Sequence, residues 1–591
     1  MTTELARLLH GECPPSAQHA INSALVTARP HRDAGRHGSI AQIGRLAASL
    51  PGIREQHSDI DTLACLLSQT AVADPSLFMS ALLHYTLCGG SIANLGTTQE
   101  AQVHLDALDS GAAKGVYLIT EIGTSGSLTG ASTRAVYEPR TREFVLTTPD
   151  PQGLKFSSVA PDGGPVIAVL FARLIHEGRD EGVYPFIVPL TGTSRPLPGV
   201  EISQPFTVSA LPLRYGVMRL QRVRIPYGNW LSGGGSISDS GVFHDPTPGG
   251  VRLTRSLAAG GASMYATLPS SMAAIARVGA ARAIRYAENR STQDRLTSGA
   301  RLLSYRTQQV SLFGALADAI ALTAVARQAR ATLERECVTD RAVHLGPWTS
   351  VHPDAPVYKA ISTEGAVRVI RECRERCGLH GMLDANELSP YQGLAEAFVT
   401  AGGDNRLILI DSGIALAESP DPPPEAPPPG DDVTAPDWWP SVCLAHRTSL
   451  AAGTRKELSR AKGQWPHLLH EAHALGQAHA HHLATEALNK TLASIADPDL
   501  KAALEKLSAL YGVMQACRLA GPLVASGALR TTAVRSLMPA AVDLCDQISP
   551  HLPLLYEIGE LSHQPHVPLD SVSYATALTS IIPLWHKGGP A

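Results

Sequence analysis

The spacing of hydrophobic residues divides the chain into segments of two kinds. Over residues 1–114 alanine and leucine dominate, and Pro-Gly and Gly-Gly pairs interrupt the pattern, which predicts a domain of several helices. Short runs of β-forming residues follow, such as "GVYLIT" and "PVIAVLFARL", and turns of Gly, Pro, Ser and Asp separate them. We therefore expect a β domain over residues 115–245.

Helical spacing returns after this β-rich part. In "VSLFGALADAIALTAVA" apolar residues recur at every fourth position, as on a helix face that points into a core, so we expect a second α domain over residues 246–418. Nine prolines then fall within residues 419–440, which predicts an extended linker. Residues 441–591 are again rich in alanine and leucine, and they predict a C-terminal α domain. The whole pattern indicates an α+β protein.

Composition and charge exclude several classes of function. The chain has 591 residues, and its 44% of hydrophobic residues can fill more than one core. A net charge of −4 gives no basic surface for phosphates, so we expect no nucleic-acid partner. The longest apolar run, near Val166 to Leu174, is too short to cross a bilayer, and no charged-then-apolar leader precedes it. We expect no membrane span and a cytoplasmic location.

Several motifs resemble one family along most of the chain. The motifs are "TEIGTSGSLTGASTRAVYEPRTREFVLTTP", "AIRYAENR", "LLSYRTQQVSLFGALA" and "CRERCGLHGM". With them the chain resembles the acyl-CoA oxidases, the flavin-dependent branch of the acyl-CoA dehydrogenase fold. The resemblance implies an N-terminal helical domain, a central β domain, a helical bundle and an additional C-terminal helical domain.

The same resemblance implies a chemistry. FAD would bind noncovalently between the β domain and the second α domain, and the reaction would be α,β-desaturation of an acyl thioester, with O₂ reoxidising the flavin to give hydrogen peroxide. A base must remove the proton α to the carbonyl while the flavin accepts hydride from the β carbon. The family completes its cofactor site with a second chain, so we expect at least a dimer, as a homodimer or as a heteromer.

The resemblance also implies cofactor-binding residues. They are a threonine that hydrogen-bonds the flavin, small residues that let the backbone approach the ring, an arginine for the pyrophosphate, glutamines that reach the neighbouring subunit's cofactor, and glycines of a turn. Without the motifs, the same residues would be an ordinary turn, a solvated arginine and surface glutamines. The positions are Thr120, Gly123, Ser127, Arg290, Gln308, Gln309, Gly378 and Gly381.

The position of the family's catalytic base departs from the pattern. Oxidases of this family read close to Tyr-Glu-Gly-(Asp/Glu)-Asn, and the glutamate is the base; here the stretch is "AGGDN", and the glutamate position is Gly402. Some relatives carry their glutamate on an earlier helix, and the equivalent position here falls near Met264, with no carboxylate close by. Neither expected location holds an acid.

Three explanations stay open. In the first, the base is relocated to Asp404 or to Glu396, and both are candidate catalytic residues. In the second, the substrate needs no protein base, as in a tailoring oxidase of a biosynthetic pathway that acts on an acyl group carried by CoA or by a carrier protein. In the third, the chain is a catalytically silent partner in a heteromer.

A histidine-rich stretch, "HLLHEAHALGQAHAHH", raises the question of a metal. Its His470 and His473 are one residue short of the HExxH zinc spacing, and a three-residue spacing alone is a weak signal. We interpret the stretch as a polar helix face and expect no metal site.

Overall fold

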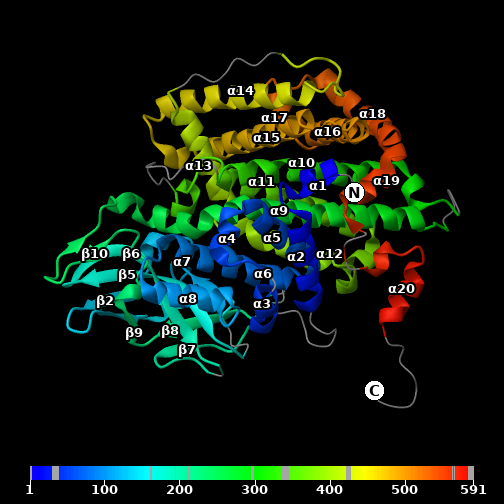
Figure 1. The fold of residues 1–591 in the computed structure, drawn as a ribbon. Coiled ribbons are helices and arrows are strands. Elements are labelled where there is room, and N and C mark those ends of the chain that lie inside the picture. Colours follow the sequence, from blue (N-terminus) through cyan, green and yellow to red (C-terminus); the bar gives the residue numbers. More distant parts are fainter. Residues whose placement is uncertain are drawn as a thin grey trace.

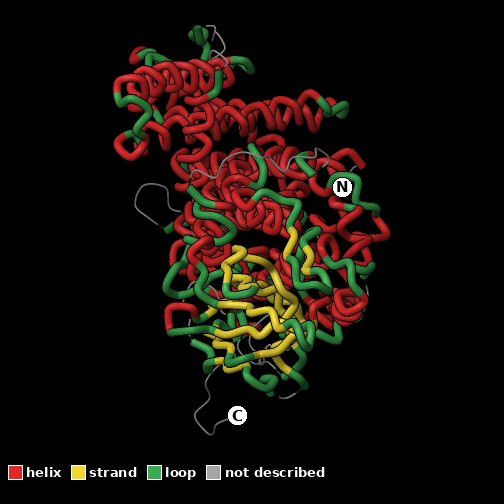
Figure 2. The backbone as a smooth tube through the Cα atoms, turned by 90° about the vertical axis from the view of Figure 1, so that its left-hand side faces the viewer, coloured by secondary structure: helices red, strands yellow, loops and turns green. Residues whose placement is uncertain are grey.

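The fold combines a helical body with a sheet domain at one end. The computed structural model describes residues 3–28, 39–48, 50–159, 163–193, 195–206, 208, 213–293, 299–333, 345–420, 428–561, 564 and 566–582. Figure 1 shows the strands gathered below one end of a stack of long helices, and Figure 2 shows, from the side, that strands occur only in this lower part. The expected α+β class is confirmed.

The N-terminal helices form the first part of the body. Helix starts are well capped: Asp74 precedes a proline and accepts hydrogen bonds from the Ser76 and Leu77 amides at 3.0 and 3.2 Å. The helices are α1 (Thr3–His10), α2 (Pro15–Ala28), α3 (Ile40–Ala47), α4 (Ile53–Ser58), α5 (Ile60–Ala73), α6 (Pro75–Leu82), α7 (Gly89–Leu95) and α8 (Gln99–Asp109), with a π-helix η1 (Leu83–Cys88) between α6 and α7.

All strands fall between Lys114 and His244, in a domain with its own apolar core. The larger sheet has the order β1-β5-β2-β3-β9 with β6 also paired to β5, the smaller one β4-β8-β7, and β10 pairs with β11. The strands are β1 (Lys114–Leu118), β2 (Arg134–Glu138), β3 (Glu143–Thr147), β4 (Lys155–Ser157), β5 (Val166–His176), β6 (Arg179–Thr191), β7 (Val200–Ile202), β8 (Gly216–Leu220), β9 (Val223–Pro226), β10 (Ser236–Ile237) and β11 (Phe243–His244).

The pairing of β1 and β2 with β5 determines where the loop between these two strands begins and ends. Strand β6 pairs with β5 over the length of β5, so β1 and β2 share the other edge of that strand. β1 takes the first half of this edge and β2 the second half, both in parallel pairing. The connection between them, residues 119–133, therefore projects from the middle of a sheet edge.

A bundle around one long helix forms the centre of the molecule. Helix α9 has 41 residues, about 60 Å at about 1.5 Å per residue, and it runs from the sheet domain to the opposite end (Figure 1). It packs against α5, α10 and α11. The bundle helices are α9 (Gly249–Asn289), α10 (Arg306–Ala331), α11 (Ala355–Arg376), α12 (Leu388–Thr400) and α13 (Asn405–Glu418).

The C-terminal helices cover the bundle. Helices α13 and α15 cross with backbones almost in contact, because a Cβ added at Gly413 or at Gly476 would lie 1.9 Å from a carbonyl oxygen of the other helix. The helices are α14 (Trp438–Arg460), α15 (Leu469–Ala493), α16 (Pro498–Arg518), α17 (Ala520–Ala525), α18 (Thr531–Ile548), α19 (Leu552–Ile558) and α20 (Tyr574–Ile581).

The predicted end of the linker needs correction. Helix α14 begins at Trp438, so the last residues of the predicted linker are helical; both tryptophans there are buried, and Pro440 lies in the first turn, where proline is tolerated. Part of the linker, residues 421–427, lies outside the described residues. Two helical stretches, Pro75–Leu95 and Arg306–Ala331, are long and apolar enough to cross a bilayer, but they are 94% and 89% buried inside the fold. The second of them contains the four-residue apolar repeat that predicted a core-facing helix.

Candidate functional site

The loop between α12 and α13 brings together the two positions where an acid was expected. Gly402 and Gly403 adopt φ values of +68° and +95°, a left-handed conformation that favours glycine. A Cβ added at Gly402 would lie 3.0 and 3.1 Å from Cε and Sδ of Met264, a buried residue of α9. Positions that are far apart in the sequence are therefore neighbours, and the Met264 thioether lies where a side chain at position 402 would extend.

Buried side chains hold this loop by its backbone. The Tyr265 hydroxyl donates to the Gly402 carbonyl at 2.8 Å and is 3.2 Å from the Trp348 carbonyl. The Lys359 amine, on α11, donates to the Gly403 carbonyl at 2.5 Å and to Asn405 Oδ1 at 2.9 Å. Hydrogen bonds from two helices thus fix the direction in which Gly402 faces Met264.

Lys359 is an unusual group in this position. Its side chain is fully buried, and burial lowers the pKa of its amine to about 7, against the opposing effect of Asp404 and Glu364. Burial also raises the pKa of Glu364, which accepts a hydrogen bond from Asn405 at 3.3 Å. We did not expect this lysine from the sequence, because no spacing links it to a loop 43 residues later.

The two candidate bases differ in their surroundings. Asp404 adjoins the glycine pair, but one of its carboxylate oxygens caps α13 and accepts from the Arg406 and Leu407 amides at 2.8 and 3.3 Å. Glu396 is exposed on α12, and the Gln392 amide donates to it at 2.6 Å. The geometry favours Asp404 over Glu396, and the role of each stays a prediction.

The loop that projects from the sheet edge carries three predicted cofactor residues. Thr120 is half-buried, and its carbonyl accepts from the Phe156 amide at 3.2 Å. Gly123 and Ser127 are exposed, and between them a Cβ added at Gly126 would meet nothing within 4 Å. This part of the loop is therefore open to a ligand.

A buried ion pair anchors both ends of that loop. Glu121 accepts from the Ser132 and Thr133 amides at 2.7 and 3.0 Å, and its carboxylate is 2.9 Å from the Lys155 amine, with both side chains fully buried. Burial raises the pKa of Glu121, but the charge of Lys155 and these hydrogen bonds outweigh burial and lower it. Burial lowers the pKa of Lys155 to about 8. No spacing in the chain predicts this pair, because it depends on β4 lying beside the loop.

The remaining predicted cofactor residues lie at the other end of α9. Arg290 follows the last residue of the helix, is exposed, and its guanidinium lies 5.7 Å from the ring centre of Tyr286. Gly378 has φ +59°, and a Cβ added at Gly381 would lie 2.2 Å from the Arg374 carbonyl oxygen, so each position favours glycine. The turn between them carries His380, whose Nδ1 is 2.8 Å from the Tyr286 hydroxyl.

The two glutamines at the start of α10 differ from each other. Gln309 accepts a hydrogen bond from Arg306 at 2.9 Å. The Oε1 atom of Gln308 is buried without a hydrogen-bond partner among the described residues, which is costly unless another group meets it.

The predicted cofactor residues thus form two separate groups. Met264 precedes Arg290 by 26 positions on α9, so the two are roughly 39 Å apart at about 1.5 Å per residue. The loop belongs to the sheet domain, and α9 runs from that domain to the opposite end of the molecule, where Arg290 follows it (Figure 1). If both groups serve one cofactor, we expect them to come from two chains, as the family resemblance implies.

Comparisons with known proteins give a consistent result. Two family models match: the acyl-CoA oxidase C-alpha1 domain over residues 263–416, which include Met264 and Gly402, and acyl-CoA oxidase over residues 441–555. The peroxisomal acyl-coenzyme A oxidase 2 of Arabidopsis thaliana is 28% identical over 379 residues, which cover 59% of this chain and 52% of that protein. The chain thus spans about half the length of the curated relatives that it matches.

Solved structures show the same fold. Acyl-CoA oxidase 1 of Yarrowia lipolytica has a TM-score of 0.81 at 18% identity, with 99% of this chain and 93% of that chain covered. Acyl-CoA oxidase-1 of Caenorhabditis elegans, solved in complex with FAD and ATP, has a TM-score of 0.78 at 19% identity, with 98% of this chain and 91% of that chain covered.

Proposed function

Because the chain belongs to the acyl-CoA oxidase family, we propose that it is an FAD-dependent oxidoreductase that oxidises an acyl thioester with a relocated or absent protein base. The observation that carries the proposal is the contact between Gly402 and Met264. The family motifs assign the proton-accepting carboxylate to either position, and the fold places both at one point. This contact supports a site in which the family's base is absent from both of its expected positions.

The described residues fit FAD. The loop at the sheet edge offers exposed small residues with open space at Gly126, and Thr120 adjoins it. At the far end of α9, the exposed planar guanidinium of Arg290 has the geometry to donate to a pyrophosphate, and Gln308 Oε1 is a buried acceptor that meets no donor among the described residues. When bound, FAD would accept hydride from the substrate and pass the electrons to O₂ to give hydrogen peroxide.

The chain's own residues prepare the site for proton removal. Tyr265 and Lys359 hold the carbonyls of the glycine pair, and so keep Gly402 against the buried thioether of Met264. Asp404 is the carboxylate adjacent to the glycine pair in the chain. As the relocated base it would use the oxygen that does not cap α13. A substrate with a more acidic α proton would not need Asp404 as a base.

Two conservative variants test the relocated base. We expect Asp404→Asn to lower the rate of peroxide release with acyl-CoA substrates by about 10²- to 10⁴-fold, the usual contribution of a positioned general base. Glu396→Gln is the matched control, because Glu396 is exposed and hydrogen-bonded to Gln392, and its rate should not change. The measurement is peroxide release by the FAD-loaded protein over a panel of acyl-CoA chain lengths.

The other outcomes separate the remaining explanations. Unchanged rates in both variants would exclude these two residues and favour a substrate that needs no protein base, as in a tailoring oxidase. A wild-type protein that binds FAD and oxidises no acyl thioester would overturn the proposal in favour of a silent partner subunit.

A further inference from the structure

A cavity lies among the C-terminal helices, apart from both groups of predicted cofactor residues. Its volume is about 370 Å³, within the range of roughly 300–1,000 Å³ that is usual for small-molecule sites. Helices α14, α15 and α17 supply its walls, and Figure 1 shows these helices on the side of the molecule away from the sheet domain. The residues that line it belong neither to the loop between β1 and β2, nor to the glycine pair, nor to the turn around His380.

Apolar side chains make up more than half of the residues in the cavity wall. Leu450 comes from α14, Ala474 and Ala478 come from α15, and Leu519 and Pro522 lie at the start of α17. No Asp, Glu, Lys or Arg among the described residues lines this cavity. Because apolar surface gains free energy when it leaves water, the wall suits a ligand whose body is largely apolar and uncharged.

One buried histidine of the wall has an acceptor without a partner. The Ser526 hydroxyl donates to the Leu523 carbonyl at 3.1 Å, since a carbonyl only accepts, and so it has no hydrogen left for His446. Nδ1 of His446, 2.7 Å from the Ser526 hydroxyl oxygen, is therefore the donor. Burial lowers the pKa of His446, so Nε2 of the neutral ring is an acceptor. His446 is 8% exposed, and its Nε2 meets no donor among the described residues, which is costly unless a ligand supplies one.

Two further polar groups of the wall lie one turn apart on α15. Gln477 and His481 make no side-chain hydrogen bond within the described part of the chain, and both also line a smaller cavity towards α10 and α11. Burial, helped by the charges of Arg368 and Arg518, lowers the pKa of His481 to about 3, so this second imidazole is neutral as well. The wall thus offers an amide and neutral acceptors to the polar end of a ligand.

We propose that this cavity binds a neutral, largely apolar small molecule that carries a hydroxyl group, and that this hydroxyl donates to Nε2 of His446. A carboxylate has no hydrogen to donate to Nε2 and would meet no cation in the wall, and an ammonium group would meet no carboxylate. A hydroxyl both donates and accepts, so its oxygen is also a partner for the Gln477 amide. This binding needs neither flavin nor thioester, and so it goes beyond the proposed function.

Two matched probe molecules test the hydroxyl. 4-Propylphenol carries the hydroxyl on an apolar body, and 4-propylanisole has the same body but an ether oxygen that cannot donate. Equilibrium dialysis against the full-length protein measures both affinities. We expect saturable binding of one 4-propylphenol per chain, and binding of 4-propylanisole that is about three- to tenfold weaker, the usual effect of one lost hydrogen bond.

Three variants locate the binding. His446→Asn puts an amide as many bonds from the backbone as Nδ1, and so keeps a donor for Ser526 while it removes Nε2; 4-propylphenol should bind about three- to tenfold more weakly, and no better than 4-propylanisole. Ala525→Trp, at an exposed position of the wall, should fill the space and weaken both probes. The matched control is His470→Asn, which is exposed on α15 outside the cavity and should change neither affinity.

Any of three results would overturn the proposal. They are no saturable binding of 4-propylphenol, equal affinity of the wild type for both probes, and unchanged affinity in Ala525→Trp. Melting temperatures show whether each variant keeps the fold. If His446→Asn does not fold, the wild-type comparison of the two probes and Ala525→Trp still decide. Failure of acyl-CoA oxidation would leave these results unaffected, because no flavin chemistry takes part.

Discussion

Restoring an acid at the glycine pair is expected to give the largest functional change. In the double variant Gly402→Glu with Met264→Ala, we expect acyl-CoA to reduce the bound flavin about 10²- to 10⁴-fold faster than in the wild type, the contribution of a positioned general base. The new side chain would start where the Gly402 Cβ points, at the place that Met264 now fills. Anaerobic stopped-flow measurement of flavin reduction checks this.

Both substitutions are needed for a physical reason. A glutamate at φ +68° costs about 1–2 kcal/mol of backbone strain, and its Cβ would lie 3.0 Å from Met264 Cε unless that side chain is shortened. The matched control is Gly402→Gln with Met264→Ala, which has the same strain and shape but no base. If the glutamate and glutamine variants reduce flavin equally fast, the glycine pair is not at the proton-transfer position.

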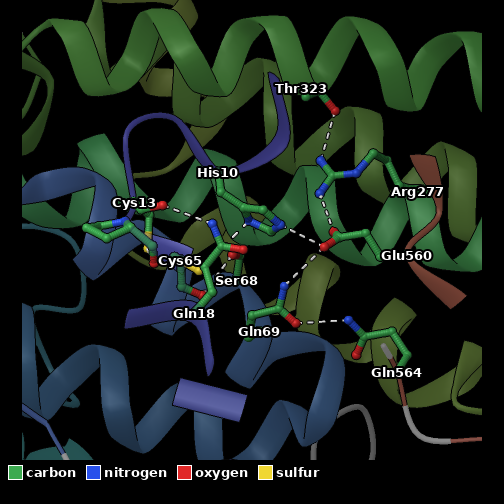
Figure 3. A network of polar contacts seen from close by, with 11 residues as sticks. His10, Cys13, Gln18, Cys65, Ser68, Gln69, Arg277, Thr323, Glu560 and Gln564 are labelled. Carbon is green, nitrogen blue, oxygen red and sulfur yellow. Dashed lines mark hydrogen bonds and ion pairs between the residues drawn. The ribbon is translucent and has the colours of Figure 1, made fainter. Parts of the chain in front are cut away.

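The largest stability effect is expected at Glu560. This buried carboxylate is 2.7 Å from His10 and 3.2 Å from Arg277, and so joins the end of α19 to α1 and α9. Glu560→Gln leaves the buried guanidinium of Arg277 without its counter-charge and replaces the charged partner of His10 by a neutral amide (Figure 3), which should cost about 3–5 kcal/mol of the free energy of unfolding. Denaturant unfolding near pH 7 measures it, with the exposed Glu557→Gln as control, for which the change should stay within about 0.5 kcal/mol.

The same residue predicts the acid dependence of stability. Burial raises the pKa of Glu560, but His10 and Arg277 outweigh burial and lower it from the ordinary 4.5 to about 2. A carboxylate with a lowered pKa stabilises the fold above its unfolded value, so this contribution, on the order of 3 kcal/mol, is present above about pH 4.5 and is lost as the pH falls towards 2. The Gln variant should lack this part of the acid transition. An identical acid transition in both proteins would contradict the assignment.

The sequence predicted the parts of the fold that depend on local pattern. Periodicity separated the helical and β-rich segments. The motif around Thr120 lies in the loop between β1 and β2, whose two ends are set by the pairing of these strands with β5. The predicted end of the linker was wrong, because proline content does not reveal that the two tryptophans at the start of α14 are buried in the fold. The four-residue apolar repeat correctly predicted the buried helix Arg306–Ala331.

The candidate site was only half predictable. Gly402 and Met264 were found from motifs, but their contact is a property of the fold. Lys359 and the pair Glu121–Lys155 were missed because each acts on residues far away in the chain, through hydrogen bonds that no spacing reveals. The cytoplasmic location and the role of each cofactor residue stay predictions.

The most direct test is whether the chain holds FAD, and in which oligomer. After incubation with FAD, the protein is separated by size-exclusion chromatography with detection of flavin absorbance. We predict one FAD per chain, eluting with a dimer, because the loop of the sheet domain and Arg290 lie toward opposite ends of α9 (Figure 1) and the family resemblance implies a cofactor site shared between two chains. A colourless protein would contradict flavin chemistry altogether, and a monomer saturated with flavin would contradict the site shared between two chains.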